Sequence, residues 1–162
     1  MDYTKLSSYQ NPEGVLVDRL APRTDKRLSM MSMYDLCHDR SVLDVGCNNG
    51  YFVREAIKNQ ARRAVGVDKS DCIIGARELA RQENIKAEFW QLNVESKEFK
   101  RFCPQFEVIF LMSVITHLKD MESFLDWLDD RIVYTLLFES NHGEKNKRHI
   151  DLVTKHINFD TV

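Results

Sequence analysis

Short apolar runs alternate with amphipathic segments through most of the chain. The runs Ser41–Val45, 64–67, 87–92, Phe106–Met112 and 132–138 read as strands, and 51–59, 70–83, 95–102 and 118–129 read as helices. The runs are apolar along nearly their whole length, as strands covered on both faces are. The alternation predicts an α/β fold with a mostly parallel, doubly wound sheet, followed by a charged helix over 142–156.

The length of 162 residues suits one domain with a real core. We expect an N-terminal lead-in over 1–38 that folds as a lid, with a helix near its end, and a ligand-binding domain over 39–162. Residues 157–162 read as the approach to a sixth strand, so we expect a C-terminally truncated chain. A sheet that stops at five strands leaves the last one at an open edge, which a second copy or a partner would cover.

Charge and cysteine usage exclude several function classes. The net charge of −2 gives no support for broad affinity to nucleic acid. The four cysteines lack zinc spacing, so we predict no metal site. No apolar stretch reaches the roughly 18 residues of a membrane helix, and no export signal is recognisable, which favours a cytoplasmic protein without membrane contact.

The first strand runs into a turn that contains two glycines and opens a helix. Gly46 and Gly50 permit positive φ and close approach of a ligand, and Asn48 tolerates positive φ better than most residues. A helix N-terminus favours a carboxylate, and Asp44 can face an ammonium group. The turn therefore suits a ligand with an amino-acid-like end. A dinucleotide would want G-x-G-x-x-G, but Asn48 and Tyr51 stand at the second and third glycine positions.

The second strand ends at Asp68, 18 residues after Gly50. An acidic residue about 20 positions after a glycine turn, at the end of the next strand, can accept hydrogen bonds from ribose hydroxyls. The two segments together point to a nucleoside ligand with an amino-acid part.

These residues carry a family resemblance. VLDVGCNNG (42–50) followed by AVGVD (64–68) resembles motifs I and II of class I, Rossmann-like methyltransferases that use S-adenosylmethionine (SAM). FWQLNV (89–94), FEVIFLMSVITHL (106–118) and TLLFE (135–139) resemble the family's third, fourth and fifth motifs. The resemblance implies strand order 3-2-1-4-5 and a C-terminal hairpin, strands six and seven, that is missing here. The family's G-x-G-x-G is G-x-N-x-G in this chain.

The resemblance also implies a set of SAM-binding residues. Asp44, Gly46 and Asn48 would hold the methionine end, Asp68 the ribose, and Asn93 with the Val94 backbone the adenine, while Met112 and Ser113 would lie under the sulfonium. The full set that we predict to bind the cofactor is Asp44, Gly46, Cys47, Asn48, Gly50, Asp68, Lys69, Asn93, Val94, Met112 and Ser113.

His117, just past the fourth strand, is the candidate general base for a hydroxyl or amine acceptor. The resemblance implies methyl transfer, and we favour a small-molecule acceptor. One alternative is RNA, with tRNA as the favoured kind, because Asn-Asn-Gly-Tyr-Phe also resembles enzymes that alkylate the wobble uridine. In that case the basic strip Arg54, Lys58, Arg62 and Arg63 would meet phosphate. The other alternative is a SAM-binding module without catalysis that works with a partner.

Overall fold

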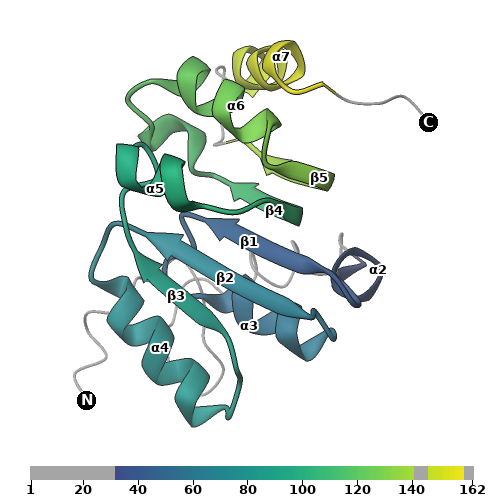
Figure 1. The fold of residues 1–162 in the computed structure, drawn as a ribbon, viewed down its shortest axis with the longest axis vertical. Coiled ribbons are helices and arrows are strands. Elements are labelled where there is room, and N and C mark those ends of the chain that lie inside the picture. The colour runs from purple at the N-terminus through teal and green to yellow at the C-terminus, as the bar shows by residue number, and fades with distance from the viewer. Residues whose placement is uncertain (1–31, 141–145, 159–162) are drawn as a thin grey trace.

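A computed structural model describes residues 32–140 and 146–158. In it five parallel strands form one sheet in the order β3-β2-β1-β4-β5 (Figure 1). The strands are β1 (Ser41–Val45), β2 (Arg63–Asp68), β3 (Glu88–Gln91), β4 (Phe106–Met112) and β5 (Ile132–Glu139). The predicted fold class and strand order are confirmed.

Helices cover both faces of the sheet. One face carries α2 (Met33–Cys37), α3 (Tyr51–Lys58) and α4 (Cys72–Gln82), and the other carries α5 (Lys97–Phe102), α6 (Met121–Asp129) and α7 (Asn146–His156). A short 3-10 helix, η2 (Ile115–His117), lies between β4 and α6.

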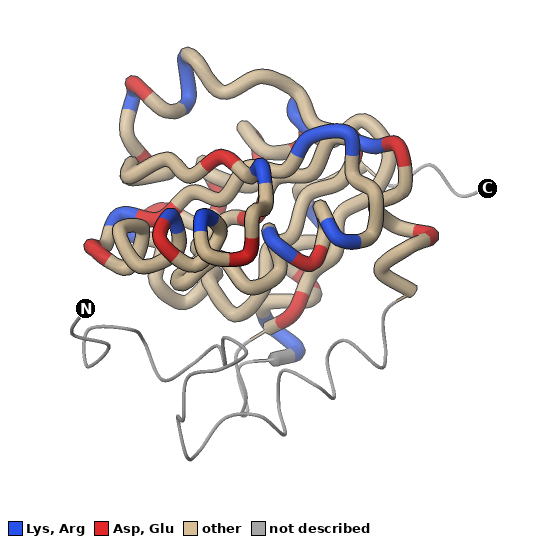
Figure 2. Tube along the Cα trace, turned by 90° about the horizontal axis from the view of Figure 1, so that it is seen from below, with Lys and Arg blue, Asp and Glu red and all other residues tan. Residues whose placement is uncertain are grey.

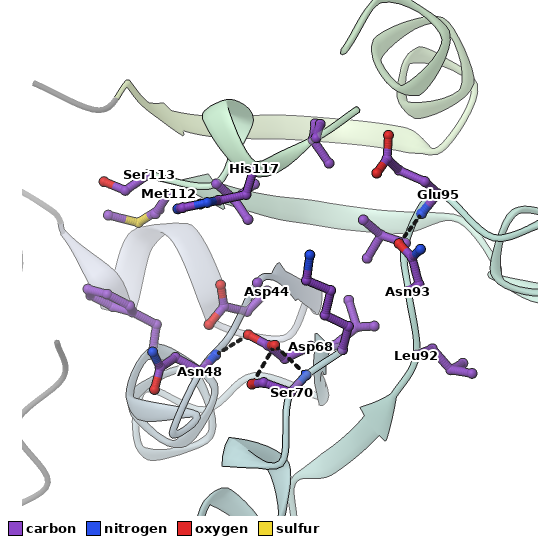
Figure 3. Close-up of a pocket in the computed structure, with 17 residues that line it drawn as sticks. Asp44, Asn48, Asp68, Ser70, Leu92, Asn93, Glu95, Met112, Ser113 and His117 are labelled. Atoms are coloured by element: carbon purple, nitrogen blue, oxygen red, sulfur yellow. Dashed lines mark hydrogen bonds between the residues drawn. The ribbon is translucent and has the colours of Figure 1, made fainter. Parts of the chain in front are cut away.

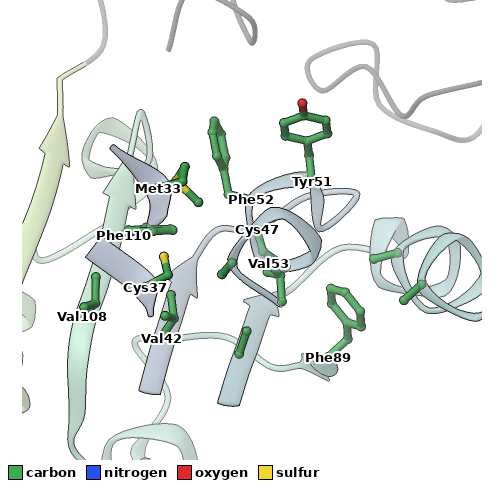
Figure 4. Close-up of a cluster of buried hydrophobic side chains, with 14 of the residues drawn as sticks. Met33, Cys37, Val42, Cys47, Tyr51, Phe52, Val53, Phe89, Val108 and Phe110 are labelled. Atoms are coloured by element: carbon green, nitrogen blue, oxygen red, sulfur yellow. The ribbon is translucent and has the colours of Figure 1, made fainter. Parts of the chain in front are cut away.

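The alternation of side chains along each strand explains why the strands are apolar throughout. In β4, Val108 and Phe110 pack into the α2–α4 layer, and Ile109 and Leu111 pack into the α5–α7 layer. All four are fully buried. Figure 4 shows the first layer, in which Met33 and Cys37 of α2 pack over the β1–β4 side of the sheet. Because each face of the sheet has its own hydrophobic core, a central strand needs an apolar residue at every position.

Three predicted helix starts were wrong. The helix predicted from residue 118 begins at Met121, because η2 intervenes and Asp120 caps α6 by accepting a hydrogen bond from Ser123 N (3.1 Å). The helix predicted from residue 95 begins at Lys97, after the Ser96 cap. The helix predicted from residue 70 begins at Cys72, and Ser70 is not its N-cap residue. The Ser70 hydroxyl donates instead to Asp68 Oδ1 (2.8 Å).

The remaining expectations concern the N-terminal lead-in and the open edge of the sheet. Of the proposed lead-in over 1–38, residues 1–31 lie outside the described residues, and part of the rest forms α2. β5 is an edge strand of the described sheet, with Val133 and Tyr134 exposed. That a second copy or a partner covers this edge stays a prediction. Among the described residues, none of the helices combines the length and apolar character needed to span a bilayer.

Candidate functional site

A cavity of about 370 Å³ opens at the carboxyl ends of β1, β2, β3 and β4 (Figure 3). Its volume lies within the usual range of small-molecule sites, roughly 300–1,000 Å³. In a parallel sheet the ligand site is expected at these strand ends, where the strand order reverses. The lining residues are Asp44, Gly46, Asn48, Phe52, Val67, Asp68, Lys69, Ser70, Leu92, Asn93, Val94, Glu95, Met112, Ser113, Val114, His117 and Leu118.

The glycine turn after β1 has the backbone that its sequence predicts. Gly46, Asn48 and Gly50 have φ values of 73°, 52° and 68°. A Cβ at Gly46 would lie 2.4 Å from Val114 Cγ2, and one at Gly50 would lie 2.2 Å from Phe89 Cε1. Both glycines are therefore required by conformation and by space, Gly46 against the β4 exit and Gly50 against β3.

The turn's own N–H groups are mostly engaged within the protein. Gly46 N and Cys47 N both donate to Val67 O (2.8 and 3.1 Å), and Gly50 N donates to Cys47 O (2.8 Å). Asn48 N donates to Asp68 Oδ2 (3.0 Å). These four N–H groups are not offered to a ligand. The end of β2 holds three of them, those of Gly46, Cys47 and Asn48, and the turn itself holds the fourth.

Two carboxylates face the cavity from adjacent strands. Asp44 in β1 is only 2% exposed and lines the cavity floor. Asp68, at the end of β2, accepts hydrogen bonds from Ser70 N (2.9 Å), from the Ser70 hydroxyl (2.8 Å) and from Asn48 N. Asn48 Oδ1 is buried and has no hydrogen-bond partner among the described residues. A buried acceptor without a donor costs about 1–3 kcal/mol, so the Asn48 amide favours a partner that donates a hydrogen bond.

The loop after β3 forms a second side of the cavity. Asn93 Oδ1 accepts a hydrogen bond from Glu95 N (3.0 Å), which closes a local turn. Glu95 Oε1 in turn accepts from the backbone N–H groups of Lys119 (2.8 Å) and Asp120 (2.9 Å). The loop that follows β3 is thereby bonded to the loop that precedes α6.

The segment after β4 forms the third side. Met112, Ser113 and His117 lie opposite Asn48 and Asp68 in Figure 3. Ser113 has a φ of 57°, which is uncommon outside glycine, and its N–H donates to Glu139 O of β5 (2.8 Å). His117 is exposed at the rim.

Most of the predicted site residues come together in this cavity. Asp44, Gly46, Asn48, Asp68, Lys69, Asn93, Val94, Met112, Ser113 and His117 all line it. Cys47 and Gly50 do not. Cys47 is fully buried against Gly66, and burial raises the pKa of its thiol well above the usual value. The two positions shape the turn rather than line the cavity.

Sequence reasoning missed these lining residues: Phe52, Val67, Ser70, Leu92, Glu95, Val114 and Leu118. Ser70, Val114 and Leu118 follow strand ends within a few residues of predicted ones, so proximity was a usable signal for them. Glu95 directly follows the predicted Val94, so the same signal applied to its position, but not to its hydrogen bonds, whose partners lie more than 20 positions away. Within residues 32–140 and 146–158, no three His, Cys, Asp or Glu side chains are grouped so as to hold a metal ion.

The basic strip predicted on and after the first helix is not a free surface. Arg54 is 1% exposed, which contradicts its predicted surface position, and its Nε donates to Glu83 Oε1 (2.9 Å). The other pairs are Lys58 with Glu55 and Glu83, Arg62 with Asp39 and Glu107, and Arg63 with Glu88. Basic and acidic positions are interspersed over the described chain in Figure 2. Each strip residue thus already has a carboxylate partner.

The sequence matches a known protein family and several known proteins. The model of a family described as "Methyltransferase domain" matches residues 43–132. The chain is 30% identical over 98 residues to a tRNA U34 carboxymethyltransferase of Haemophilus ducreyi, covering 59% of this chain and 30% of that protein. A protein of the same name from Vibrio campbellii is 32% identical over 98 residues, covering 59% of this chain and 29% of the relative. The match thus spans less than a third of the length of these relatives.

Solved structures share the fold. The N-methyltransferase NodS from Bradyrhizobium japonicum, in complex with S-adenosyl-L-homocysteine, superposes with a TM-score of 0.68 at 15% identity, covering 90% of this chain and 80% of that one. A ribosomal protein L11 methylase from Lactobacillus delbrueckii gives 0.66 at 16% identity, covering 82% and 68%. At these identities the likeness is one of fold.

Proposed function

Because the chain belongs to the methyltransferase domain family, we propose that it binds SAM in the cavity at the strand ends and transfers its methyl group to an acceptor. One observation carries the proposal: Asp44, next to the last residue of β1, and Asp68, the last residue of the adjacent β2, both line one cavity together with a positive-φ glycine turn. This arrangement supports a ligand with an ammonium group and a ribose. The glycine turn lacks the spacing for a dinucleotide.

The cavity residues fit the parts of SAM. The buried Asp44 carboxylate and Asn48 Oδ1 are acceptors for the ammonium group of the methionine end. A carboxylate has about four acceptor positions, and three on Asp68 already hold protein donors. The two ribose hydroxyls would therefore meet the remaining Asp68 position and the Ser70 hydroxyl, which can rotate. Asn93 Oδ1 has a second lone pair for the adenine amino group.

The protein's part in the reaction is positioning. Bound SAM supplies a methyl group that its sulfonium already activates, so holding the acceptor in line provides most of the rate. Met112 and Ser113 form the side of the cavity nearest the predicted sulfonium position. His117, exposed at the rim, is placed to take a proton from an acceptor hydroxyl or amine.

We favour a small-molecule acceptor, and the paired state of the basic strip supports this choice. Arg54 is buried, and Lys58, Arg62 and Arg63 each contact a carboxylate, which reduces the positive charge that the strip offers to phosphate. The second candidate is tRNA, which the names of the Haemophilus and Vibrio relatives favour. The third is SAM binding without transfer, in a complex with a partner.

Transfer of label from tritiated SAM tests the proposal. The chain is incubated with the labelled cofactor and, separately, with a low-molecular-mass cell extract and with total tRNA, with His117→Ala as a matched variant. Label in the extract and not in tRNA supports the favoured acceptor class. Label in tRNA supports the second candidate, and SAM binding with no transfer to either supports the third.

A further inference from the structure

Glu95 bonds two sides of the cavity together. Its Oε1 accepts hydrogen bonds from the N–H groups of Lys119 and Asp120 at 2.8 and 2.9 Å. Glu95 is itself held by the turn in which Asn93 Oδ1 accepts from Glu95 N. In Figure 3 the Glu95 side chain lies beside Asn93, at the β3 side of the cavity. A carboxylate acceptor makes each of these hydrogen bonds stronger than a neutral one would be.

The segment that Glu95 holds is the cavity side formed by residues 112–118. At its near end, Ser113 N donates to Glu139 O of β5. In its middle, Ile115 is fully buried and His117 N donates to Val114 O (2.9 Å). At its far end, the next two residues, Lys119 and Asp120, donate to Glu95. The segment is therefore tied to the sheet at one end and to the β3 loop at the other.

The hydrogen bonds that connect this segment to the loop after β3 come from one side chain, that of Glu95. Leu118 is the C-cap of η2, with its N–H donating to Ile115 O (3.3 Å), and Asp120 is the N-cap of α6, so Lys119 lies between the two caps. Of the hydrogen bonds formed by the described residues, those to Glu95 connect this stretch to the β3 loop. His117 and Leu118 both line the cavity directly before it.

We infer that Glu95 is a positioning residue for the proposed SAM site: by holding the amides of Lys119 and Asp120, it fixes the 112–118 side, with His117, across the cavity from Asp68. The inference rests on the proposed function. Without the tie, this side would sample positions in which Met112, Ser113 and His117 no longer face the cofactor together. Binding would then include the entropic cost of ordering it.

The test compares three variants by SAM titration calorimetry and amide hydrogen exchange. Glu95→Ala removes the acceptor, Glu95→Gln keeps an oxygen that can accept both bonds, and Glu98→Ala is the matched control, since Glu98 is an exposed α5 glutamate outside the cavity lining. In Glu95→Ala we expect about tenfold weaker SAM binding and about tenfold faster exchange at Lys119 and Asp120. The His117 imidazole resonances should move as well.

Glu95→Gln should restore all three readouts to near wild type, and Glu98→Ala should leave them unchanged. Thermal unfolding of each variant shows whether it is folded. If Glu95→Ala binds SAM as tightly as wild type, or exchange at Lys119 and Asp120 is unchanged, the inference is overturned while the proposed function stands. If the folded wild-type chain does not bind SAM, the proposed function is overturned, and the inference falls with it.

Discussion

Gly46 leaves no room for a side chain. A Cβ there would lie 2.4 Å from Val114 Cγ2, at a φ of 73°. The left-handed conformation alone costs an L-residue roughly 1–2 kcal/mol, and the contact adds to it. We therefore expect Gly46→Ala to lower the free energy of unfolding by about 2 kcal/mol or more, measured by urea denaturation.

The double variant Gly46→Ala/Val114→Ala separates the two causes. Removing the Val114 methyl groups should recover the part due to contact and leave the part due to φ. Gly46→Ala with wild-type stability would show that the turn is not held in this conformation.

Burial keeps three of the four thiols protonated. It raises the pKa of Cys37 to about 12 and that of Cys103 to about 11, and it raises the pKa of Cys47 well above its usual range. In the unfolded chain these thiols ionise near pH 8.5. Above that pH the unfolded state therefore binds fewer protons than the folded state, and stability falls as pH rises.

We expect the free energy of unfolding to decline from about pH 9 upward, by as much as roughly 1.4 kcal/mol per pH unit for each such thiol. Urea denaturation across pH 8–11 measures the decline. Cys103→Ala should reduce the decline of the unfolding free energy with pH by the amount that Cys103 contributes. An equal slope in the variant and wild type would contradict the assignment of Cys103.

Residue-level prediction worked where the cause was local. The positive φ at Gly46, Asn48 and Gly50 followed from residue type and spacing, and the structure confirms it. The bonds of Glu95 and the burial of Arg54 did not follow, because each depends on a partner from a distant segment.

At the scale of elements, the contact between α3 and α4 contains a buried ion pair. Arg54 Nε donates to Glu83 Oε1, and its Nη1 donates to Asn49 O (2.8 Å). Breaking a buried pair typically costs about 3–5 kcal/mol. Because Glu83 is partly exposed and also binds Lys58, we expect the lower end, about 3 kcal/mol, for Arg54→Met.

Denaturant unfolding of Arg54→Met measures this loss. Arg62→Ala is the control, because its ion pairs are exposed and should change stability by less than about 1 kcal/mol. A loss in Arg54→Met no larger than in the control would contradict a structural role for the pair.

Hydrophobic periodicity predicted the order and type of the helices and strands. It predicted their first and last residues less accurately. Strands β1 and β4 were predicted to the residue, since a buried strand is bounded by the limits of its apolar run. The start of α6 was misplaced because Leu118 extends the apolar pattern toward the N-terminus. In the structure η2 and the Asp120 cap come first, and the helix begins three residues later.

At the scale of the whole molecule, the distribution of charge bears on the acceptor. Counterion release makes phosphate binding fall steeply with salt, by about one power of salt concentration per contact. Since Arg54, Lys58, Arg62 and Arg63 already have carboxylate partners, we expect tRNA binding to change little between 50 and 200 mM salt, roughly the range over which phosphate contacts are lost. Filter binding with total tRNA measures it, and a steep loss with salt would favour the RNA candidate.

Calorimetric titration shows whether the cavity is a SAM site and whether Asp68 belongs to it. SAM and, separately, NADH are titrated into the wild-type chain and into Asp68→Ala, with thermal unfolding to show that both are folded. We expect saturable SAM binding by the wild type, loss of that binding in Asp68→Ala, and no binding of NADH. A folded wild-type chain that binds no SAM, or an Asp68→Ala variant that binds it as tightly as wild type, would contradict the account.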